Sequence, residues 1–518
     1  MVRPYKVIDL FAGPGGLAEG FSSVMTGGKR LFDVVLSVEM EQAAHQTLTL
    51  RAFTRQFPAK SLPDEYYSFV AGEMPLEELY EYYPKEWASA RKEALRLQLG
   101  TPEAAKLLQP KIDRIKTQAK GRTILIGGPP CQAYSLVGRA RNAGNADYKA
   151  EDDGRHFLYR EYIEILDRLR PAAFVMENVK GILSSAVAGG GVFERIIQDL
   201  KQVGIEDGGY KLMALAPSQE SSWTSPEDIP HSDFIVRTEH HQVPQSRHRV
   251  IVVGLRADIA SEIFGSEMTA LLERREPTSV REVLGGMPEL RSGLSKGDDQ
   301  ESWRRVVQDA TAQLLSVSLD AGTAPERKRM TRILKSVAQY HGSNNMVPSR
   351  SGTEYDVDQL SKGLPEKLSE FLIDGKLTVL AHHTARGHMK SDLARYLFCS
   401  AFSEVHSRSP KAADFPAELA PNHKSWCTGK FADRFRVQGW EKPSTTITSH
   451  ISKDGHYYIH PDPKQCRSLT VREAARLQTF PDNYLFLGTR TQQYVQVGNA
   501  VPPFIAKQIA EALKKILP

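Results

Sequence analysis

Cysteine is scarce in this chain of 518 residues, which has only four, at positions 131, 399, 427 and 466. They lack the CxxC spacing of a zinc ribbon, and they are too few for the disulfide framework of a small secreted protein. Apolar runs are short, and none approaches the roughly 18 residues that cross a membrane. The amino terminus has no basic-then-apolar signal pattern. These absences predict a cytoplasmic protein with no membrane association and no metal site.

Charge of one sign is only in small excess, with 67 Lys and Arg against 62 Asp and Glu, a formal net charge of +5. This excess weakly favours an anionic partner such as a nucleic acid. The chain is 41% hydrophobic and 25% charged, which is typical of a folded globular protein. It contains no internal repeat or low-complexity tract. Its length suits two to four domains, or one domain enlarged by insertions.

Short apolar segments separated by helical patterns predict an open α/β sheet. Each segment has the length and continuous apolar character of a buried strand. The predicted strands cover residues 5–10, 32–38, 123–126, 174–176 and 249–253.

Two stretches depart from this pattern. Residues 58–121 are rich in Glu, Lys, Ala and Leu, with a helix start at Thr101 and a stop at Gly121, and we interpret them as a helical insertion. Residues from about 260 to 440 are polar, basic and aperiodic, which indicates a separate, smaller domain. Helical periodicity returns from Leu469 to the end of the chain.

A glycine-rich segment, Phe11-Ala-Gly-Pro-Gly-Gly16, follows the first strand and precedes a helical pattern. Glycines at such a turn allow backbone N–H groups to approach a nucleotide-like ligand. Glu39 ends the next strand, where a carboxylate can accept hydrogen bonds from ribose hydroxyls. The alternatives are a tight turn without a ligand and a solvated surface glutamate.

Cys131 lies in Gly128-Pro-Pro-Cys-Gln132, directly after a predicted strand. The two prolines fix the backbone there and present the thiol at the sheet edge where ligands bind. This placement suits a nucleophile, although an inert buried cysteine is the alternative. Glu177 ends the strand at 174–176, so a carboxyl group is expected at the same edge. Arg247 and Arg249 follow on an extended segment, where they can hold carbonyl or phosphate oxygens or form a basic edge.

Taken together and in order, these motifs resemble the cytosine-C5 DNA methyltransferases. The matching strings are Phe11-Ala-Gly-Pro-Gly-Gly16, Glu39, Pro129-Pro-Cys-Gln132, Glu177-Asn-Val179, Gln245-x-Arg247-x-Arg249, Arg476-Leu-Gln-Thr-Phe-Pro-Asp482 and Gln496-Val-Gly-Asn499. The resemblance covers residues 1–56, 122–256 and 443–518. It implies a Rossmann-like, S-adenosylmethionine-dependent methyltransferase sheet with a smaller target-recognition domain.

The resemblance also implies the catalytic roles. The thiolate of Cys131 attacks C6 of cytosine, Glu177 binds the N3 and N4 edge, and Arg249 holds O2 with help from Arg247. C5 then takes the methyl group of S-adenosylmethionine. The cofactor pocket implied by the family comprises Phe11, Gly13, Gly16, Glu39, Pro130, Leu158 and Asn499.

The domain boundaries follow from the same resemblance. Residues 1–258 form the catalytic and cofactor-binding domain, 259–442 the target-recognition region, and 443–518 a segment that returns to the catalytic domain. The substrate is then a short, specific sequence in duplex DNA, whose target base is rotated out of the helix. We expect a monomer on DNA in a bacterial, nucleoid-associated enzyme of a restriction-modification or phage-defence system, with possible companion proteins.

Two alternatives remain at this stage. A cytosine-C5 methyltransferase acting on transfer RNA shares the catalytic motifs, and a catalytically silent DNA-binding relative shares the fold. The sequence leaves open the recognition sequence, the oligomeric state and the role of the insertion. It also leaves open which residue contacts the adenine, because the acidic segment usual in the family is replaced here by the insertion, with Asp64 and Glu73 as weak candidates.

Overall fold

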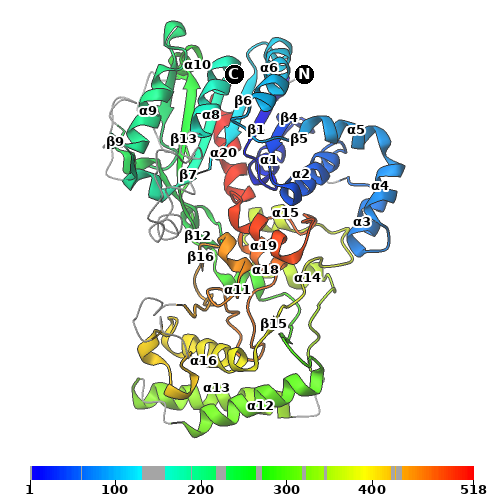
Figure 1. The fold of residues 1–518 in the computed structure, drawn as a ribbon, viewed down its shortest axis with the longest axis vertical. Helices are drawn as coiled ribbons and strands as arrows, with labels where there is room; N and C mark the ends of the chain where they lie inside the picture. The colour runs from blue at the N-terminus through cyan, green and yellow to red at the C-terminus, as the bar shows by residue number, and fades with distance from the viewer. Residues whose placement is uncertain are drawn as a thin grey trace. The chain divides into compact units, whose positions relative to one another are not determined.

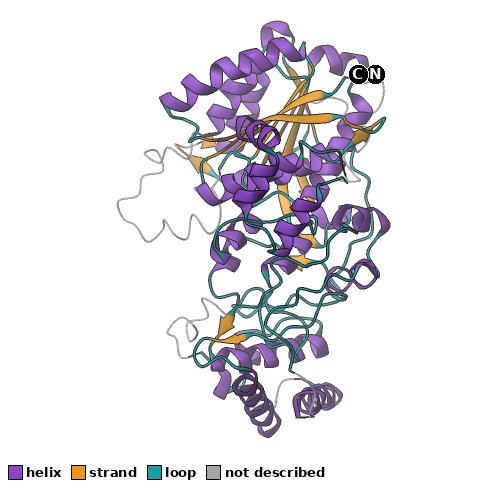
Figure 2. Cartoon of the chain, turned by 90° about the vertical axis from the view of Figure 1, so that its right-hand side faces the viewer, coloured by secondary structure: helices purple, strands orange, loops and turns teal. Residues whose placement is uncertain are grey.

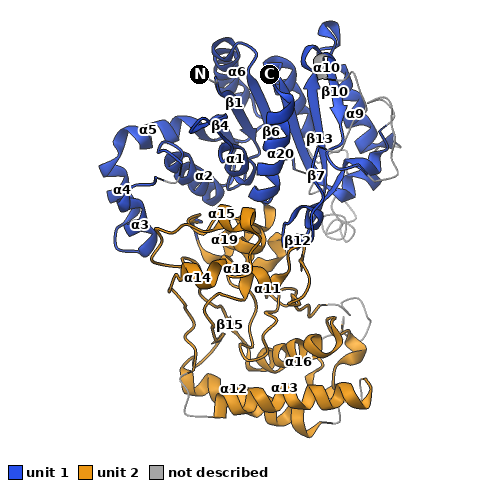
Figure 3. Cartoon of the chain, turned by 180° about the vertical axis from the view of Figure 1, so that it is seen from behind, with its two compact units in different colours: residues 1–276, 486–488, 500–518 blue, residues 277–485, 489–499 orange. Residues whose placement is uncertain are grey.

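The chain divides into two compact units, shown in different colours in Figure 3. The computed structural model describes residues 3–59, 61–130, 158–187, 190–217, 229–263, 271–317, 322–342, 347–421, 426 and 434–518. The first unit comprises residues 1–276, 486–488 and 500–518, and the second comprises 277–485 and 489–499. The final helix of the chain therefore belongs to the same unit as the first strand.

An eight-stranded sheet forms the centre of the first unit (Figure 1). Its strands are β1 (Tyr5–Leu10), β4 (Phe32–Glu39), β5 (Ala94–Arg96), β6 (Thr123–Gly127), β7 (Ala173–Val179), β10 (Tyr210–Met213), β11 (Ile235–Arg237) and β13 (His248–Arg256). The order is β10-β13-β7-β6-β1-β4-β5, and β11 also pairs with β13. All five strands predicted from the sequence are present, and the predicted α/β fold class is confirmed.

One strand of the sheet, β13, runs opposite to all the others. The strands from β7 to β5 are parallel, whereas β13 is antiparallel to β7, and β10 and β11 are antiparallel to β13. The order in which the chain adds strands also reverses at the centre of the sheet. From β1 the chain first adds β4 on one side, and it later adds β6 on the other side. Ligands of open α/β sheets bind at such a reversal, outside the carboxyl ends of the strands.

Helices cover both faces of this sheet, as Figure 2 shows. On one face the strand residues Ile8 and Leu10 share a buried core with the helices α6 (Pro102–Ala119), α8 (Leu158–Leu169) and α9 (Val192–Gln202). On the other face pack α1 (Gly16–Ser22), α2 (Gln42–Thr54) and α20 (Pro503–Ile516). Burial on both faces explains why the strands are continuously apolar in sequence.

The insertion at 58–121 is mainly helical, as predicted. It contains α3 (Asp64–Ala71), α4 (Leu76–Tyr82), α5 (Pro84–Glu93) and α6. Thr101 caps α6 by accepting a hydrogen bond from the N–H of Ala104 at 3.2 Å, so the predicted helix start is confirmed. The short strand β5 was not predicted, and it pairs with β4 in parallel. The insertion thus extends the edge of the central sheet.

Three long helices form the main core of the second unit. They are α12 (Gln300–Ser316), α13 (Ala324–Gly342) and α16 (Lys390–His406), which pack around Trp303, Leu334 and Leu397. The prediction of an aperiodic region here is wrong. The apolar positions of α12 and α13 follow helical spacing, but wide polar faces and long polar connections dilute them in the sequence.

The remaining elements are shorter. They are β2 (Met25–Thr26), β3 (Lys29–Arg30), β8 (Ala186–Val187), β9 (Gly190–Gly191), α10 (Ala257–Ile263), α11 (Val280–Leu284), β12 (Gln245–Ser246), β14 (Gly293–Leu294), α14 (Val357–Ser361), α15 (Glu366–Leu372), β15 (Gly387–His388), β16 (Ser444–Thr445), α18 (Val471–Leu477) and α19 (Arg490–Asn499). In the described part of the chain, no helix combines the length and the apolar character of a membrane span.

Candidate active site

The site lies at the carboxyl ends of β1 and β6, which are neighbours at the reversal of the sheet. The glycine-rich segment leaves β1 after Leu10, and Gly128-Pro-Pro130 leaves β6 after Gly127. Sequence segments more than 100 residues apart therefore begin at the same edge. Cys131 follows directly but lies outside the described residues, so its position stays a prediction.

The glycine-rich segment bends sharply between β1 and α1. Phe11 has φ of 56° and Gly13 has φ of 58°, and a side chain at Gly13 would meet no atom within 4 Å. Gly16 is different, because a Cβ there would lie 2.2 Å from the carbonyl oxygen of Val501, just before α20. Glycine is thus required for conformation and open space at residue 13, and for close packing at residue 16.

Glu39 ends β4 and its carboxylate holds this bend in place. One oxygen, Oε2, accepts a hydrogen bond from the N–H of Gly13 at 2.8 Å, and Oε1 accepts one from the N–H of Glu41 at 2.7 Å. Burial raises the pKa of Glu39 above its ordinary value, and these backbone N–H groups partly offset the effect. The structure therefore brings together Gly13 and Glu39, two of the predicted cofactor residues.

A buried carboxylate beneath this bend was missed in the sequence analysis. Asp9 of β1 is fully buried, and neither of its oxygens makes a hydrogen bond of good geometry within the described residues. Burial raises its pKa to about 8, although the guanidinium of Arg55 and the N–H of Ala18 favour the ionised form. The sequence contained a signal for this residue, because an aspartate inside a buried apolar strand is unusual.

Glu177 and Arg249 meet at the same edge of the sheet. Arg249 pairs with Val179 across β13 and β7, so the side chains of Glu177 and Arg249 are diagonal neighbours. Arg249 Nε lies 2.9 Å from Glu177 Oε1, and both side chains are nearly buried. The N–H is not aligned with that oxygen, so the contact is an ion pair rather than a well-formed hydrogen bond.

The turn that precedes Cys131 lies against this ion pair. A Cβ at Gly128 would lie 3.0 Å from Glu177 Oε2, and the side-chain amide of Asn178 donates to the carbonyl oxygen of Pro129 at 3.3 Å. The Asn178 side chain also accepts from the N–H of Val179 at 2.9 Å. Asn178 therefore orders the turn, while glycine at 128 leaves space for the Glu177 carboxylate.

The other predicted residues are placed less closely. Arg247 is almost completely buried, in the break between β12 and β13, so the extended segment predicted to carry both arginines is interrupted there. Leu158 is the first residue of α8 and lies beside Gly100. Its Cδ2 atom would lie 3.3 Å from a Cβ atom at Gly100. Pro130 is half-buried, and Asn499 is the exposed last residue of α19, in the second unit.

The adenine candidates in the insertion lie on or next to α3, not in the sheet. Asp64 is the first residue of α3, and Glu73 follows its end. The segment that reaches Glu39 is instead the one after β5, where the N–H of Leu97 donates to the carbonyl oxygen of Glu39 at 3.1 Å. Strand pairing thus places residues after β5 next to Glu39.

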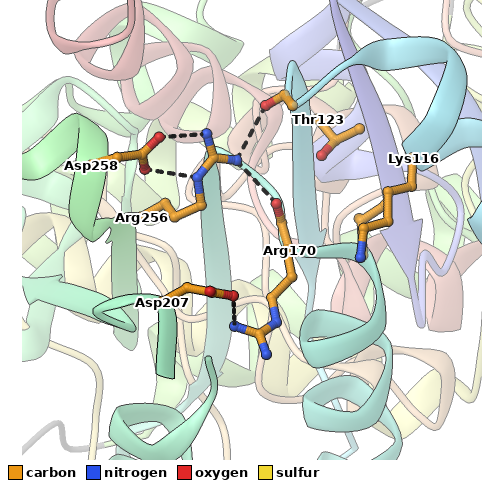
Figure 4. A pocket seen from close by; sticks show the side chains of 8 residues that line it. Lys116, Thr123, Arg170, Asp207, Arg256 and Asp258 are labelled. Carbon is orange, nitrogen blue, oxygen red and sulfur yellow. Dashed lines mark hydrogen bonds and ion pairs between the residues drawn. The ribbon is translucent and has the colours of Figure 1, made fainter. Parts of the chain in front are cut away.

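A separate pocket of about 510 Å³ opens at the opposite edge of the sheet (Figure 4). Its lining includes Thr123 at the start of β6 and Arg256 at the end of β13. Charged groups pair within it, because Arg256 contacts Asp258 at 2.7 Å and Arg170 contacts Asp207 at 3.5 Å. This pocket is therefore not part of the catalytic edge.

Buried histidines in the second unit form protein hydrogen bonds. Tyr396 joins two of them, with its hydroxyl 2.7 Å from His456 Nδ1 and 3.4 Å from His388 Nδ1. Within the residues that the structure covers, no three His, Cys, Asp or Glu side chains are arranged to hold a metal ion.

Comparison with known proteins assigns the family. The sequence profile of the C-5 cytosine-specific DNA methylases matches residues 85–515. The type II methyltransferase M.Bpa9945I of Bacillus paralicheniformis is 32% identical over 99% of each chain. The DNA (cytosine-5-)-methyltransferase M.ApeKI of Aeropyrum pernix is 26% identical, also over 99% of each.

Among solved structures, the Entamoeba histolytica methyltransferase EhMeth is 13% identical, with a TM-score of 0.44 over 100% of this chain and 99% of that one. The profile match over most of the chain and the full-length relative agree with the motifs described above. The chain therefore belongs to the C-5 cytosine-specific DNA methylase family and is a DNA (cytosine-5-)-methyltransferase.

Proposed function

We propose that this enzyme methylates C5 of cytosine within a short, specific sequence of duplex DNA, using Cys131 as nucleophile and S-adenosylmethionine as methyl donor. The observation that carries the proposal is the contact between Glu177 and Arg249 at 2.9 Å, beside the turn that leads into Cys131. A carboxyl group and a guanidinium group, each able to hydrogen-bond a cytosine, thus lie beside the turn where the Cys131 thiol is expected.

The roles of these groups follow from their chemistry. A bond forms between Cys131 Sγ and C6 of the cytosine ring, and the electron pair displaced toward N3 is met by a proton held at Glu177. Arg249, with Arg247, holds O2 of the base. The resulting enamine makes C5 nucleophilic, so that C5 accepts the methyl group. Loss of the C5 proton to solvent then returns the electron pair that expels the thiolate from C6, and N3 gives its proton back to Glu177.

When no cytosine is bound, the opposite charges of Glu177 and Arg249 partly neutralise each other. A cytosine entering between them replaces this ion pair with hydrogen bonds to both side chains, so neither charge is left buried and unpaired. The pair therefore keeps two charged groups at the edge of the sheet in an orientation suited to the base.

The residues at β1 and β4 fit S-adenosylmethionine, which when bound supplies a methyl group on a positively charged sulfur. The open space beside Gly13 lets a ligand approach the backbone, and Glu39 presents a carboxylate to ribose hydroxyls. Phe11 lies next to this space and packs against the core. Gly16, Pro130 and Leu158 complete the proposed pocket in the first unit, and the family resemblance adds Asn499, which belongs to the second unit.

Catalysis inside a duplex requires the target nucleotide to leave the base stack, at a cost of a few kcal/mol. Contacts from residues 259–442 to phosphates and base edges are proposed to offset that cost and to select the sequence. Residues 443–518 are proposed to return the chain to the catalytic domain through their last part, since residues 500–518 belong to the first unit and 443–485 and 489–499 to the second. Such an enzyme protects DNA in a restriction-modification or phage-defence system, acting as a monomer beside a companion nuclease.

Transfer of labelled methyl groups tests this proposal directly. Wild type and Cys131→Ser are incubated with S-adenosylmethionine and either mixed duplex DNA or transfer RNA, and products are mapped at base resolution. We expect 5-methylcytosine in DNA at one short motif and none with the variant. Label in RNA alone would indicate the transfer RNA branch, whereas no label in either would indicate a silent DNA-binding relative.

A further inference from the structure

The helix α13 of the second unit has two contrasting faces. Met330, Leu334, Val337 and His341 are buried against α12 and α16, as their spacing of three and four residues requires. The opposite face is fully exposed and carries Lys328, Arg329, Arg332, Lys335, Ser336 and Gln339. We call the four cations of this set, Lys328, Arg329, Arg332 and Lys335, the α13 basic face.

Positive charge is concentrated on this helix. The 19 residues of α13 include five Lys or Arg side chains and one carboxylate, Glu326. The whole chain has a formal net charge of only +5, so this one helix holds an excess close to that of the entire protein. A local excess of this kind attracts phosphate even when the overall charge is modest.

The cations of the α13 basic face make no ion pair with any carboxylate of the described residues. Neighbouring arginines behave differently. On α12, Arg304 and Arg305 lie within 3.8 Å and 3.6 Å of Glu301, and Arg408 contacts Asp414 at 2.7 Å. Most basic groups nearby are therefore neutralised within the protein, while those of α13 point to solvent with their charge available.

The helix is held firmly beneath this face. Trp303 of α12 is fully buried and donates from its indole N–H to the Ser292 hydroxyl at 2.8 Å. His341 at the end of α13 lies 5.1 Å from the Trp303 ring and 2.9 Å from the carbonyl oxygen of Lys464. Figure 1 shows α12 and α13 side by side along their length. The basic side chains thus start from a fixed backbone.

We propose that the α13 basic face binds the phosphate backbone of duplex DNA outside the recognised sequence. Lys328, Arg332 and Lys335 span seven residues of helix, about 10 Å at 1.5 Å per residue, which matches a few consecutive phosphates of one strand at about 3.4 Å rise. Such contacts add affinity without reading bases. The proposal rests on DNA as the substrate and is independent of the catalytic residues assigned above.

The test is the salt dependence of binding to a duplex that contains the methylated motif with long flanks. Each phosphate contact contributes about 0.9 to the slope of log Kd against log salt concentration. The variant Lys328→Gln/Arg332→Gln/Lys335→Gln is expected to lower this slope by about 2 to 3 and to weaken binding about 10- to 100-fold at moderate salt. The single variant Arg332→Gln should lower the slope by about 1.

A matched control removes the same charge elsewhere. Lys85, Lys106 and Arg114 are equally exposed but are dispersed over α5 and α6 of the insertion. Replacing these three with Gln should leave the slope unchanged. An equal decrease in both triple variants would mean that only net charge matters, and an unchanged slope in the α13 triple variant would also overturn the proposal.

Duplex length and the type of polyanion separate the remaining outcomes. Wild type should bind a long duplex more tightly than one trimmed to the motif, and the α13 triple variant should lose that difference. Weakened binding to single-stranded RNA or to anionic lipid vesicles, with duplex binding intact, would assign the face to another partner and refute this one. Catalysis on the trimmed duplex should be equal in both proteins, so failure of the catalytic proposal would be recognised separately.

Discussion

Glu473 of the second unit and two carboxylates of the first unit, Asp9 and Glu39, are buried in opposite ways. In the second unit, Glu473 accepts hydrogen bonds from both terminal nitrogens of Arg467, at 2.6 and 2.7 Å, and from the N–H of Thr470 at 2.7 Å. These contacts hold the pKa of Glu473 well below its usual range despite complete burial. In the first unit, burial raises the pKa of Asp9 and Glu39 instead.

On the proposed function, the difference separates a structural role for Glu473 from a ligand-binding role for Glu39. Glu473 completes the capping box of α18, and its three hydrogen bonds all come from the protein. Asp9 and Glu39 are close to the glycine-rich bend and lack a cationic hydrogen-bond partner among the described residues. The proposed role of Glu39 in binding the cofactor agrees with this incomplete compensation.

Glu177→Gln should produce the largest effect in the first unit. The amide keeps the shape of the side chain but cannot deliver a proton to N3, so methyl transfer should fall about 10²- to 10⁴-fold. Glu103→Gln, an exposed glutamate of α6, serves as the control with unchanged rate. A variant that retained wild-type rates would remove Glu177 from the chemistry.

Arg467→Met should produce the largest effect on stability in the second unit. The substitution leaves Glu473 buried with most of its compensation lost, and this should reduce the free energy of unfolding by about 3–5 kcal/mol. Lys6→Met is the matched control, since Lys6 pairs with Asp33 at a site where both side chains are more than one third exposed. Its effect should stay below about 1 kcal/mol. Chemical denaturation of both variants measures the contrast.

Asp9→Asn should stabilise the protein at alkaline pH. The folded pKa of about 8 lies above the ordinary value of 3.8, so the folded state holds a proton that the unfolded state releases. The stability contributed by Asp9 is therefore lost as pH rises from about 3.8 to about 8. The variant does not titrate, and its advantage over wild type should grow by about 3–4 kcal/mol between about pH 5 and pH 8. Equal pH dependence of stability in both proteins would contradict the raised pKa of the buried Asp9 carboxyl group.

The second unit should show the opposite pH response through its buried histidines. Burial lowers the pKa of His382 to about 3, so the folded state excludes a proton that the unfolded chain binds below about 6.5. Stability is consequently lost as pH falls below that value. His382→Asn should reduce this loss by about 1–2 kcal/mol between about pH 6.5 and pH 5. Asparagine tolerates the φ of 67° at this position, and His450→Asn at an exposed site is the control.

Local patterns in the sequence were sufficient for five of the eight strands of the sheet and for most of the motifs. Continuous apolar runs predicted β1, β4, β6, β7 and β13, because burial on both faces leaves few polar positions in a strand. The glycines and Glu39 were identified because they sit at strand ends, where an open α/β sheet binds its ligands. The threonine at position 101, which caps α6, likewise predicted the start of that helix.

Nonlocal contacts were decided only by the tertiary structure. The diagonal pairing of Glu177 with Arg249 depends on the register between antiparallel strands 70 residues apart in sequence, and β5 depends on an edge that only β4 provides. The pKa of Asp9 reflects burial beside α1, which its neighbours in sequence do not reveal. Hydrophobic periodicity and the ends of strands can be identified from short stretches of sequence. The desolvation and pairing of charged side chains arise only when distant segments pack together.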